Sequence, residues 1–123
     1  DLQKSLNIYR LNYYISHENY QGYEKTALEY YKNTDEFNAS ELLAAAGVFN
    51  DHISNPKSLQ MAARWAEKVV MSQENFDSTS ILASLYDKLG KKDEAKMFAG
   101  MAANFAKQEN RDGTKMNEIL NKK

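Results

Sequence analysis

Residues 76–110 read FDSTSILASLYDKLGKKDEAKMFAGMAANFAKQEN and hold two helical patterns on either side of Gly90. We expect Asp77 or Ser78 to cap the start of the first helix and Gly90 to end it in a left-handed conformation. In this first half, apolar side chains recur at i, i+1, i+4, i+5 and i+8, which is one stripe of a helix: Ile81, Leu82, Leu85, Tyr86 and Leu89.

The second half of the stretch begins with Asp93 and Glu94, and the helix macrodipole favours negative charge in a first turn. The stripe that follows consists mainly of small side chains, which let two antiparallel helices approach closely: Ala95, Phe98, Ala99, Ala102, Ala103 and Ala106. Residues 76–110 therefore predict a packed helical hairpin.

The spacing of this hairpin recurs upstream in the chain. Anchor positions of the hairpin have counterparts 33 residues earlier, at Phe49, Asn50, Ile53, Ala62, Ala66 and Val69. A fainter third set lies nearer the N-terminus, at Leu11, Tyr14, Tyr23, Ala27 and Tyr30. A period of this length is typical of stacked helical repeats, in which each hairpin buries its apolar face against the next one.

This spacing of small and aromatic residues, with a glycine at the turn, resembles the tetratricopeptide repeat (TPR). The resemblance implies an all-α fold, a TPR-like right-handed stack of antiparallel hairpins with about six helices. No segment alternates apolar and polar residues as a half-buried strand does. A short C-terminal helix that caps the end of the stack is predicted by Met116, Ile119 and Leu120.

Four helices are expected upstream of residue 76. Residues 20–31 predict the second, and Asn38 with Glu41 has the spacing of a capping box at the start of the third. Asn55 before Pro56 marks the start of the fourth, because proline has no N–H to leave unpaired there. The first is predicted by an apolar stripe at i, i+4, i+7 and i+11: Leu2, Leu6, Tyr9 and Tyr13.

Length and composition fit a single domain over residues 1–123. The chain has no cysteine, which excludes disulfides and thiolate metal ligands. We expect no nucleic-acid partner and no membrane insertion, because the net charge is only −1 and no apolar run approaches the ~20 residues of a membrane helix. Residue 1 is aspartate rather than methionine, so we expect a fragment of a larger protein.

Residues suited to chemistry are sparse. His17 and His52 lie in separate segments with no further ligands at metal-site spacing, and the glycines are dispersed rather than gathered in a phosphate-binding loop. No nucleophile, base and orienting group have the spacing of a known catalytic arrangement. We therefore predict no catalytic, cofactor-binding or metal-binding residues, and no enzyme.

The tyrosines crowd the first quarter of the chain. At helical spacing such rings are usually packing residues, and a platform for stacked bases needs more lysine and arginine than this region offers. A further interpretation is that Tyr9, Tyr13 and Tyr20 form an interdomain surface, which Trp65 is expected to join.

TPR stacks commonly bind peptides along the concave face that the first helix of each hairpin lines. The clamp that grips acidic peptide tails in this family uses lysine, arginine and asparagine, of which only one asparagine is matched. The face suggests a weak groove, a groove for a basic partner, or no peptide groove. The residues expected on it are small or polar: Asn12, Asp51, Ser80, Ser84 and Asp87.

A closer resemblance covers about residues 42–120. The segments WAEKVV (65–70), FDST (76–79) and LASLYDKLGKKDEA (82–95) are similar to the C-terminal helical region of a group of bacterial thioredoxin-domain proteins, although Val69 replaces the usual serine. The resemblance implies an N-terminal thioredoxin-like domain, absent from these residues, that carries a Cys-x-x-Cys pair. It also implies a periplasmic or cell-envelope location.

Two functions follow from these patterns. The first is a non-catalytic module for protein–protein or interdomain contact, an accessory domain of a thioredoxin-like redox protein. Its partner is then the missing N-terminal domain or another protein. The alternative is a stand-alone adaptor that binds a linear peptide in its concave groove.

Overall fold

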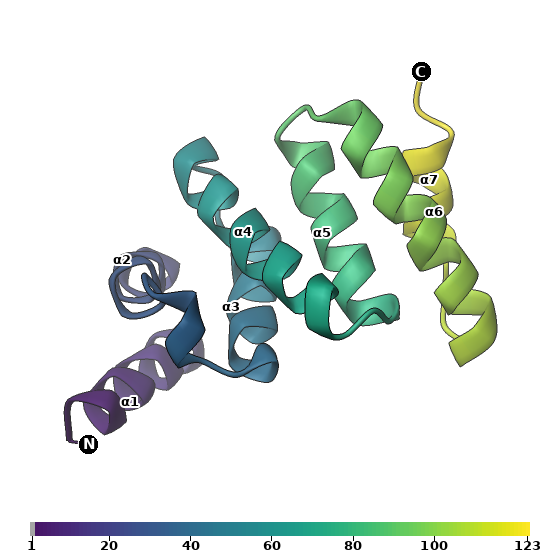
Figure 1. Ribbon diagram of the computed structural model, residues 1–123. Coiled ribbons are helices and arrows are strands. Elements are labelled where there is room, and N and C mark those ends of the chain that lie inside the picture. The colour runs from purple at the N-terminus through teal and green to yellow at the C-terminus, as the bar shows by residue number, and fades with distance from the viewer. Residues whose placement is uncertain (1) are drawn as a thin grey trace.

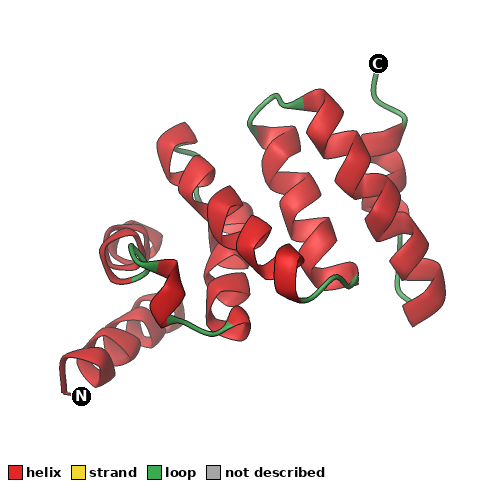
Figure 2. Ribbon diagram, viewed as in Figure 1, coloured by secondary structure: helices red, strands yellow, loops and turns green. Residues whose placement is uncertain are grey.

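The computed structural model describes residues 2–123, which fold into seven α-helices and one short 3₁₀-helix (Figure 1). No strand is present in these residues (Figure 2), so the expectation of an all-α fold is confirmed. In chain order the elements are α1 (Leu2–Ser16), α2 (Tyr20–Tyr30), η1 (Thr34–Glu36), α3 (Ala39–His52), α4 (Pro56–Ser72), α5 (Phe76–Lys88), α6 (Lys92–Glu109) and α7 (Thr114–Leu120).

Consecutive helices form three hairpins, α1 with α2, α3 with α4, and α5 with α6, which follow one another along the molecule (Figure 1). The short α7 lies against α6 and α5 at the C-terminal end. Two hydrogen bonds join the first hairpin and η1 to α4, from Ser58 Oγ to Glu24 Oε2 (2.5 Å) and from Lys68 Nζ to Thr34 Oγ1 (3.3 Å). Each joins residues 34 positions apart, close to the period of the sequence pattern.

The core centres on Trp65, which is completely buried. Its ring packs edge-on against Phe49 of α3 and against Tyr31 at the end of α2, with centroid distances of 5.0 and 5.6 Å. The expectation that Trp65 belongs to an outer surface is therefore wrong. Helix α4 contacts α2, α3 and α5. Trp65, which lies beside the stripe of Ala62 and Ala66, is therefore buried together with that stripe.

Most of the residues predicted to begin or end a helix do so in the structure. The side chains of Asn38 and Asn55 accept hydrogen bonds from the backbone N–H groups of Glu41 (2.9 Å) and Lys57 (3.0 Å). Gly90 follows α5 with a φ of +77°, in the left-handed region that glycine adopts without a Cβ clash. The predictions that these residues begin α3 and α4 and end α5 are confirmed.

The cap of α5 differs from the expected one. Its N-cap is Asn75, whose Oδ1 accepts from the N–H of Ser78 (2.9 Å), while Ser78 Oγ accepts from the N–H of Asn75 (3.2 Å). The prediction that Asp77 or Ser78 caps this helix is wrong, because the half-buried Phe76 already belongs to the first turn. Asp77 instead forms an ion pair with Arg111 (2.9 Å).

Replacing Trp65 with alanine is expected to lower the free energy of unfolding by about 3–5 kcal/mol, because a large core cavity replaces the ring. Urea denaturation followed by circular dichroism measures the change. Met71→Ala on the same helix is the control, since Met71 is exposed and its loss is expected to cost less than about 0.5 kcal/mol. Similar effects in both variants would contradict the central position of Trp65.

Asn75→Ala removes the side-chain acceptor of the α5 cap and is expected to destabilise the chain by about 1–2 kcal/mol. The same denaturation experiment measures it. Asn104→Ala, at an exposed position inside α6, is the matched control and is expected to leave stability unchanged or slightly raised, because alanine favours helix interiors. If the two substitutions have equal effects, Asn75 is not the cap.

Candidate protein-interaction surfaces

Helix α1 carries apolar side chains on two opposite sides. Leu11 is the one residue of this helix that is buried, and it joins the core of the domain. At about 100° per residue, the stripe that predicts the helix lies on the opposite side from Leu11. Its members remain exposed, and we call them the outer face of α1: Leu2 (78%), Leu6 (39%), Tyr9 (67%) and Tyr13 (46%).

Aromatic rings stack along this outer face. The centroids of Tyr9 and Tyr13 are 6.5 Å apart, and the ring of His17 lies 3.9 Å beyond Tyr13. Tyr20 lies elsewhere, half-buried at the start of α2, where its ring is parallel to that of His52 at 3.8 Å. The structure thus places Tyr9 and Tyr13 together and Tyr20 apart from them, at the joint between the first two hairpins.

A hollow of about 390 Å³, the α1/α3 hollow, lies beside α1 on a different side from the outer face. Asn12, which the sequence assigns to a concave groove, lines it. Most of its other lining residues are apolar, among them Ile8, Ile15, Ala44 and Val48. The hollow therefore offers an apolar surface at the N-terminal end of the stack.

Among the described residues that line the α1/α3 hollow, Glu41 is the one with a charged side chain. Its Oε1 accepts a long hydrogen bond from Asn38 Nδ2 (3.5 Å), whereas Oε2 is buried and has no hydrogen-bond partner among residues 2–123. Burial raises the pKa of Tyr31 in the same hollow, and the charges of Tyr23 and Glu41 add to that effect. A carboxylate oxygen removed from water without a donor costs free energy.

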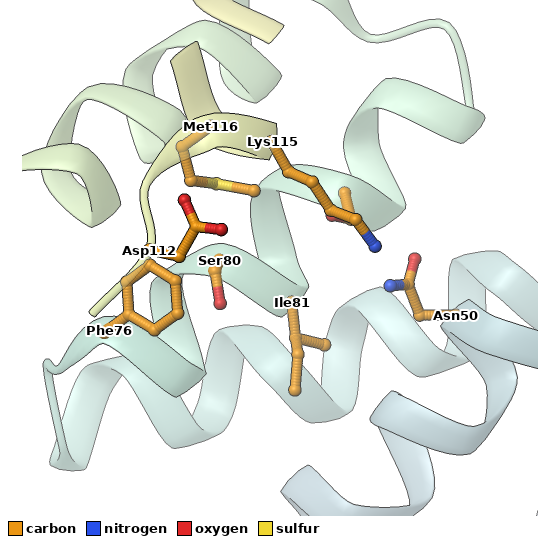
Figure 3. A pocket seen from close by; sticks show the side chains of 8 residues that line it. Asn50, Phe76, Ser80, Ile81, Asp112, Lys115 and Met116 are labelled. Atoms are coloured by element: carbon orange, nitrogen blue, oxygen red, sulfur yellow. The ribbon is translucent and has the colours of Figure 1, made fainter. Parts of the chain in front are cut away.

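The other predicted groove residues gather between α3, α5 and α7. Ser80 and Ser84 line a hollow of about 280 Å³ (Figure 3), and Asp51, Ser84 and Asp87 line a second one of about 370 Å³. Lys115 of α7 lines both hollows, so the terminal helix of the chain forms part of their walls. Asn12 does not belong to this region.

Lysines offset the acidic groups between α3, α5 and α7. Asp87 forms an ion pair with Lys122, just after α7 (2.6 Å), and Lys88 and Lys115 line the same hollow as Asp51. The expectation of a groove for a basic partner leaves out these lysines, because Lys115 and Lys122 come from a segment that is remote in sequence. The balance of charge here does not favour a basic ligand.

Burial shifts the pKa values of several tyrosines, and two of them, Tyr23 and Tyr31, line the α1/α3 hollow. Burial raises the pKa of Tyr23 to about 12, and burial also raises the pKa values of Tyr31 and Tyr86. The hydrogen bond and the charge of Lys68 lower the pKa of the exposed Asp35. Within residues 2–123, no three histidine, aspartate or glutamate side chains are arranged to hold a metal ion.

No protein-family model matches the chain, and no curated protein or solved structure is significantly similar to it. In the part of the chain that the structure describes, no helix combines the length and the apolar character that a membrane crossing needs. The function of the chain is therefore inferred from its surfaces.

Sequence reasoning assigns Asn12 to a groove but misses the apolar character of the α1/α3 hollow that it lines. Ile8 and Ile15 are seven residues apart, a spacing that places them on one side of a helix, and this signal indicates a second apolar side of α1. Glu41 is expected from the sequence only as a capping residue of α3. Its position in an apolar hollow depends on how the first hairpin lies against the second, which local patterns do not report.

Stability is expected to fall above about pH 10, because Tyr23 keeps its proton in the folded chain up to about pH 12 whereas the unfolded chain releases it near 10.0. The stabilisation is complete below pH 10 and decreases as the pH rises toward 12. Tyr23→Phe is expected to retain about 2 kcal/mol more of its neutral-pH stability than the native chain does at pH 12. Urea denaturation at several pH values measures this.

Tyr9→Phe, which removes the hydroxyl of an exposed ring, is the matched control for the alkaline experiment. If Tyr23→Phe, Tyr9→Phe and the native chain all lose stability in parallel between pH 10 and 12, the burial of Tyr23 does not cause the alkaline loss.

Proposed function

We propose that this chain is a non-catalytic helical-repeat module that binds a partner protein or a neighbouring domain through the outer face of α1. The observation that carries the proposal is the exposure of a continuous apolar stripe on the side of α1 opposite to the buried Leu11. Apolar side chains clustered on one helix face gain free energy by leaving water, about 25 cal/mol for each Å² buried. Contiguous apolar patches of this kind are typical of interaction sites.

The stack is proposed to be TPR-like. Its hairpins in a row, its hydrogen bonds between residues 34 positions apart and the left-handed Gly90 at the last turn support this assignment. In such a stack each hairpin is held by its neighbours, so a helix at the end is presented on a firm support. This arrangement suits binding rather than chemistry.

The partner is proposed to be a thioredoxin-like domain of the same protein, in the periplasm or cell envelope. The basis for this choice is the resemblance of the segments 65–70, 76–79 and 82–95 to the C-terminal region of bacterial thioredoxin-domain proteins. The cysteine-free module then positions the redox domain or its substrate, while the Cys-x-x-Cys pair of the partner domain carries the electrons.

Leu6→Glu and Tyr9→Glu place a carboxylate on the outer face of α1 and are expected to weaken partner binding about tenfold or more, because burying an unpaired charge is costly. Isothermal titration calorimetry against the separately expressed thioredoxin-like domain measures the affinity. Met71→Glu and Met97→Glu are matched controls, since both methionines are exposed on other helices, α4 and α6. The controls are expected to bind as the native chain does.

All four variants are expected to keep the native circular dichroism and urea midpoint, since the substituted side chains are exposed. Native affinity in Leu6→Glu and Tyr9→Glu would contradict the role of the outer face. A gene without a Cys-x-x-Cys domain in the same reading frame would contradict the choice of partner and favour the stand-alone adaptor. Disulfide-reductase activity of the 123-residue chain would contradict the non-catalytic role.

A further inference from the structure

Helix α7 is an internal example of how this stack binds a helical segment. It buries Met116 and Ile119 against the last hairpin. Lys122 then donates to the carboxylate of Asp87 on α5, at 2.6 Å. Two apolar side chains at positions i and i+3 thus pack against an apolar wall, and a cation at position i+6 pairs with a carboxylate.

The α1/α3 hollow has the same two components. Ile8 and Ile15 of α1 and Val48 of α3 supply an apolar wall in which both isoleucines remain exposed. Glu41 of α3 supplies the carboxylate, with its Oε2 atom buried and without a donor among residues 2–123. The hollow is larger than the one beside Ser80 at the other end of the stack, about 390 against about 280 Å³.

The cations of α1 do not line the α1/α3 hollow. Lys4 Nζ lies over the ring of Phe37, 5.7 Å from its centroid, and Arg10 lines a different hollow together with Lys25. None of the ion pairs within residues 2–123 includes Glu41. The carboxylate of Glu41 is therefore without a cationic partner among the described residues.

We propose that the α1/α3 hollow binds a helical segment of a partner protein that carries two apolar side chains one turn apart and a lysine or arginine three residues further on. The cationic end pairs with the carboxylate of Glu41, and its aliphatic stem covers Ile8 or Ile15. The inference rests on the proposed function in taking the ligand to be a protein. It concerns a different side of α1 from the outer face, so the two are tested separately.

The test uses the full 123-residue chain and fluorescein-labelled helical peptides that carry the Met, Ile and Lys spacing of α7 in an alanine and glutamine background. Fluorescence anisotropy compares the Lys peptide with the same peptide carrying Gln in place of Lys. The Lys peptide is expected to bind about tenfold more tightly, because its hydrogen bond to the carboxylate is charge-assisted. Glu41→Gln is expected to remove the difference in affinity between the two peptides. Glu118→Gln, in the hollow that Asp51 and Asp87 line, is expected to preserve it.

Ala44→Arg is a second variant that leaves the cap of α3 untouched. Ala44 is exposed on the wall of the hollow, three residues after Glu41, so an arginine there fills the hollow and supplies the missing cation from the chain itself. This variant is expected to lose Lys-peptide binding while its urea midpoint is at or above the native value. Ala44→Gln is its uncharged control and is expected to lose less affinity.

Equal affinity for the Lys and Gln peptides, absence of binding, or Lys-peptide binding that survives Glu41→Gln would overturn the proposal. A dimer in sedimentation equilibrium that Glu41→Gln dissociates would also overturn it, because the occupant would then be a second copy of the chain. If the peptides fail to bind but Leu6→Glu still abolishes partner binding, the proposed function stands and only this inference fails.

Discussion

Helix α4 has to be buried on several sides at once, and the arrangement of the other helices depends on this constraint. It contacts α2, α3 and α5, one helix from each hairpin. Its alanines let these neighbours come close, and Trp65 fills the space between Phe49 and Tyr31. Removing any neighbour would expose apolar surface of α4, so the three hairpins stabilise one another as a row rather than singly.

A row of hairpins has two ends, and the two ends of this one differ. At the C-terminal end α7 covers the last hairpin and buries Met116 and Ile119. At the other end α1 is the outermost helix of the described chain (Figure 1). It has apolar side chains on both sides. Repeat stacks usually have a polar outer surface on their end helices. The apolar outer face of α1 is therefore a departure that binding to a further protein would explain.

Local signals in the sequence predict most of the helices and several of their ends, because those signals depend on the chemistry of a few neighbouring residues. Gly90 and the pair Asn55 and Pro56 are examples. Burial is harder to predict. Periodicity places Trp65 beside the alanine stripe, but it does not report that α4 is enclosed on more than one side. For the same reason it predicts the stripe of α1 without predicting the side toward which the stripe points.

The candidate sites show the same division between local and tertiary information. The register of α5 brings Ser80, Ser84 and Asp87 to one side of that helix, as the spacing predicts. Two of the lysines that offset Asp87 lie about one repeat further along the chain, Lys115 in α7 and Lys122 just after it, and only the fold reveals them. Glu41 is a capping residue by its spacing, and its place in an apolar hollow follows from the packing of two hairpins.

Asp87 and Glu41 also differ in what they can contribute to specificity for a ligand. Asp87 already has Lys122, so a cationic ligand has to compete with a bond within the chain. Glu41 has no such partner among residues 2–123, and a ligand without a donor would leave its buried oxygen unpaired. Because the net charge of −1 gives little long-range attraction, discrimination between ligands has to come from short-range contacts of this kind. An apolar segment alone would fill the α1/α3 hollow but bring no cation to Glu41, so we expect a segment that combines an apolar anchor with a cation to bind more tightly.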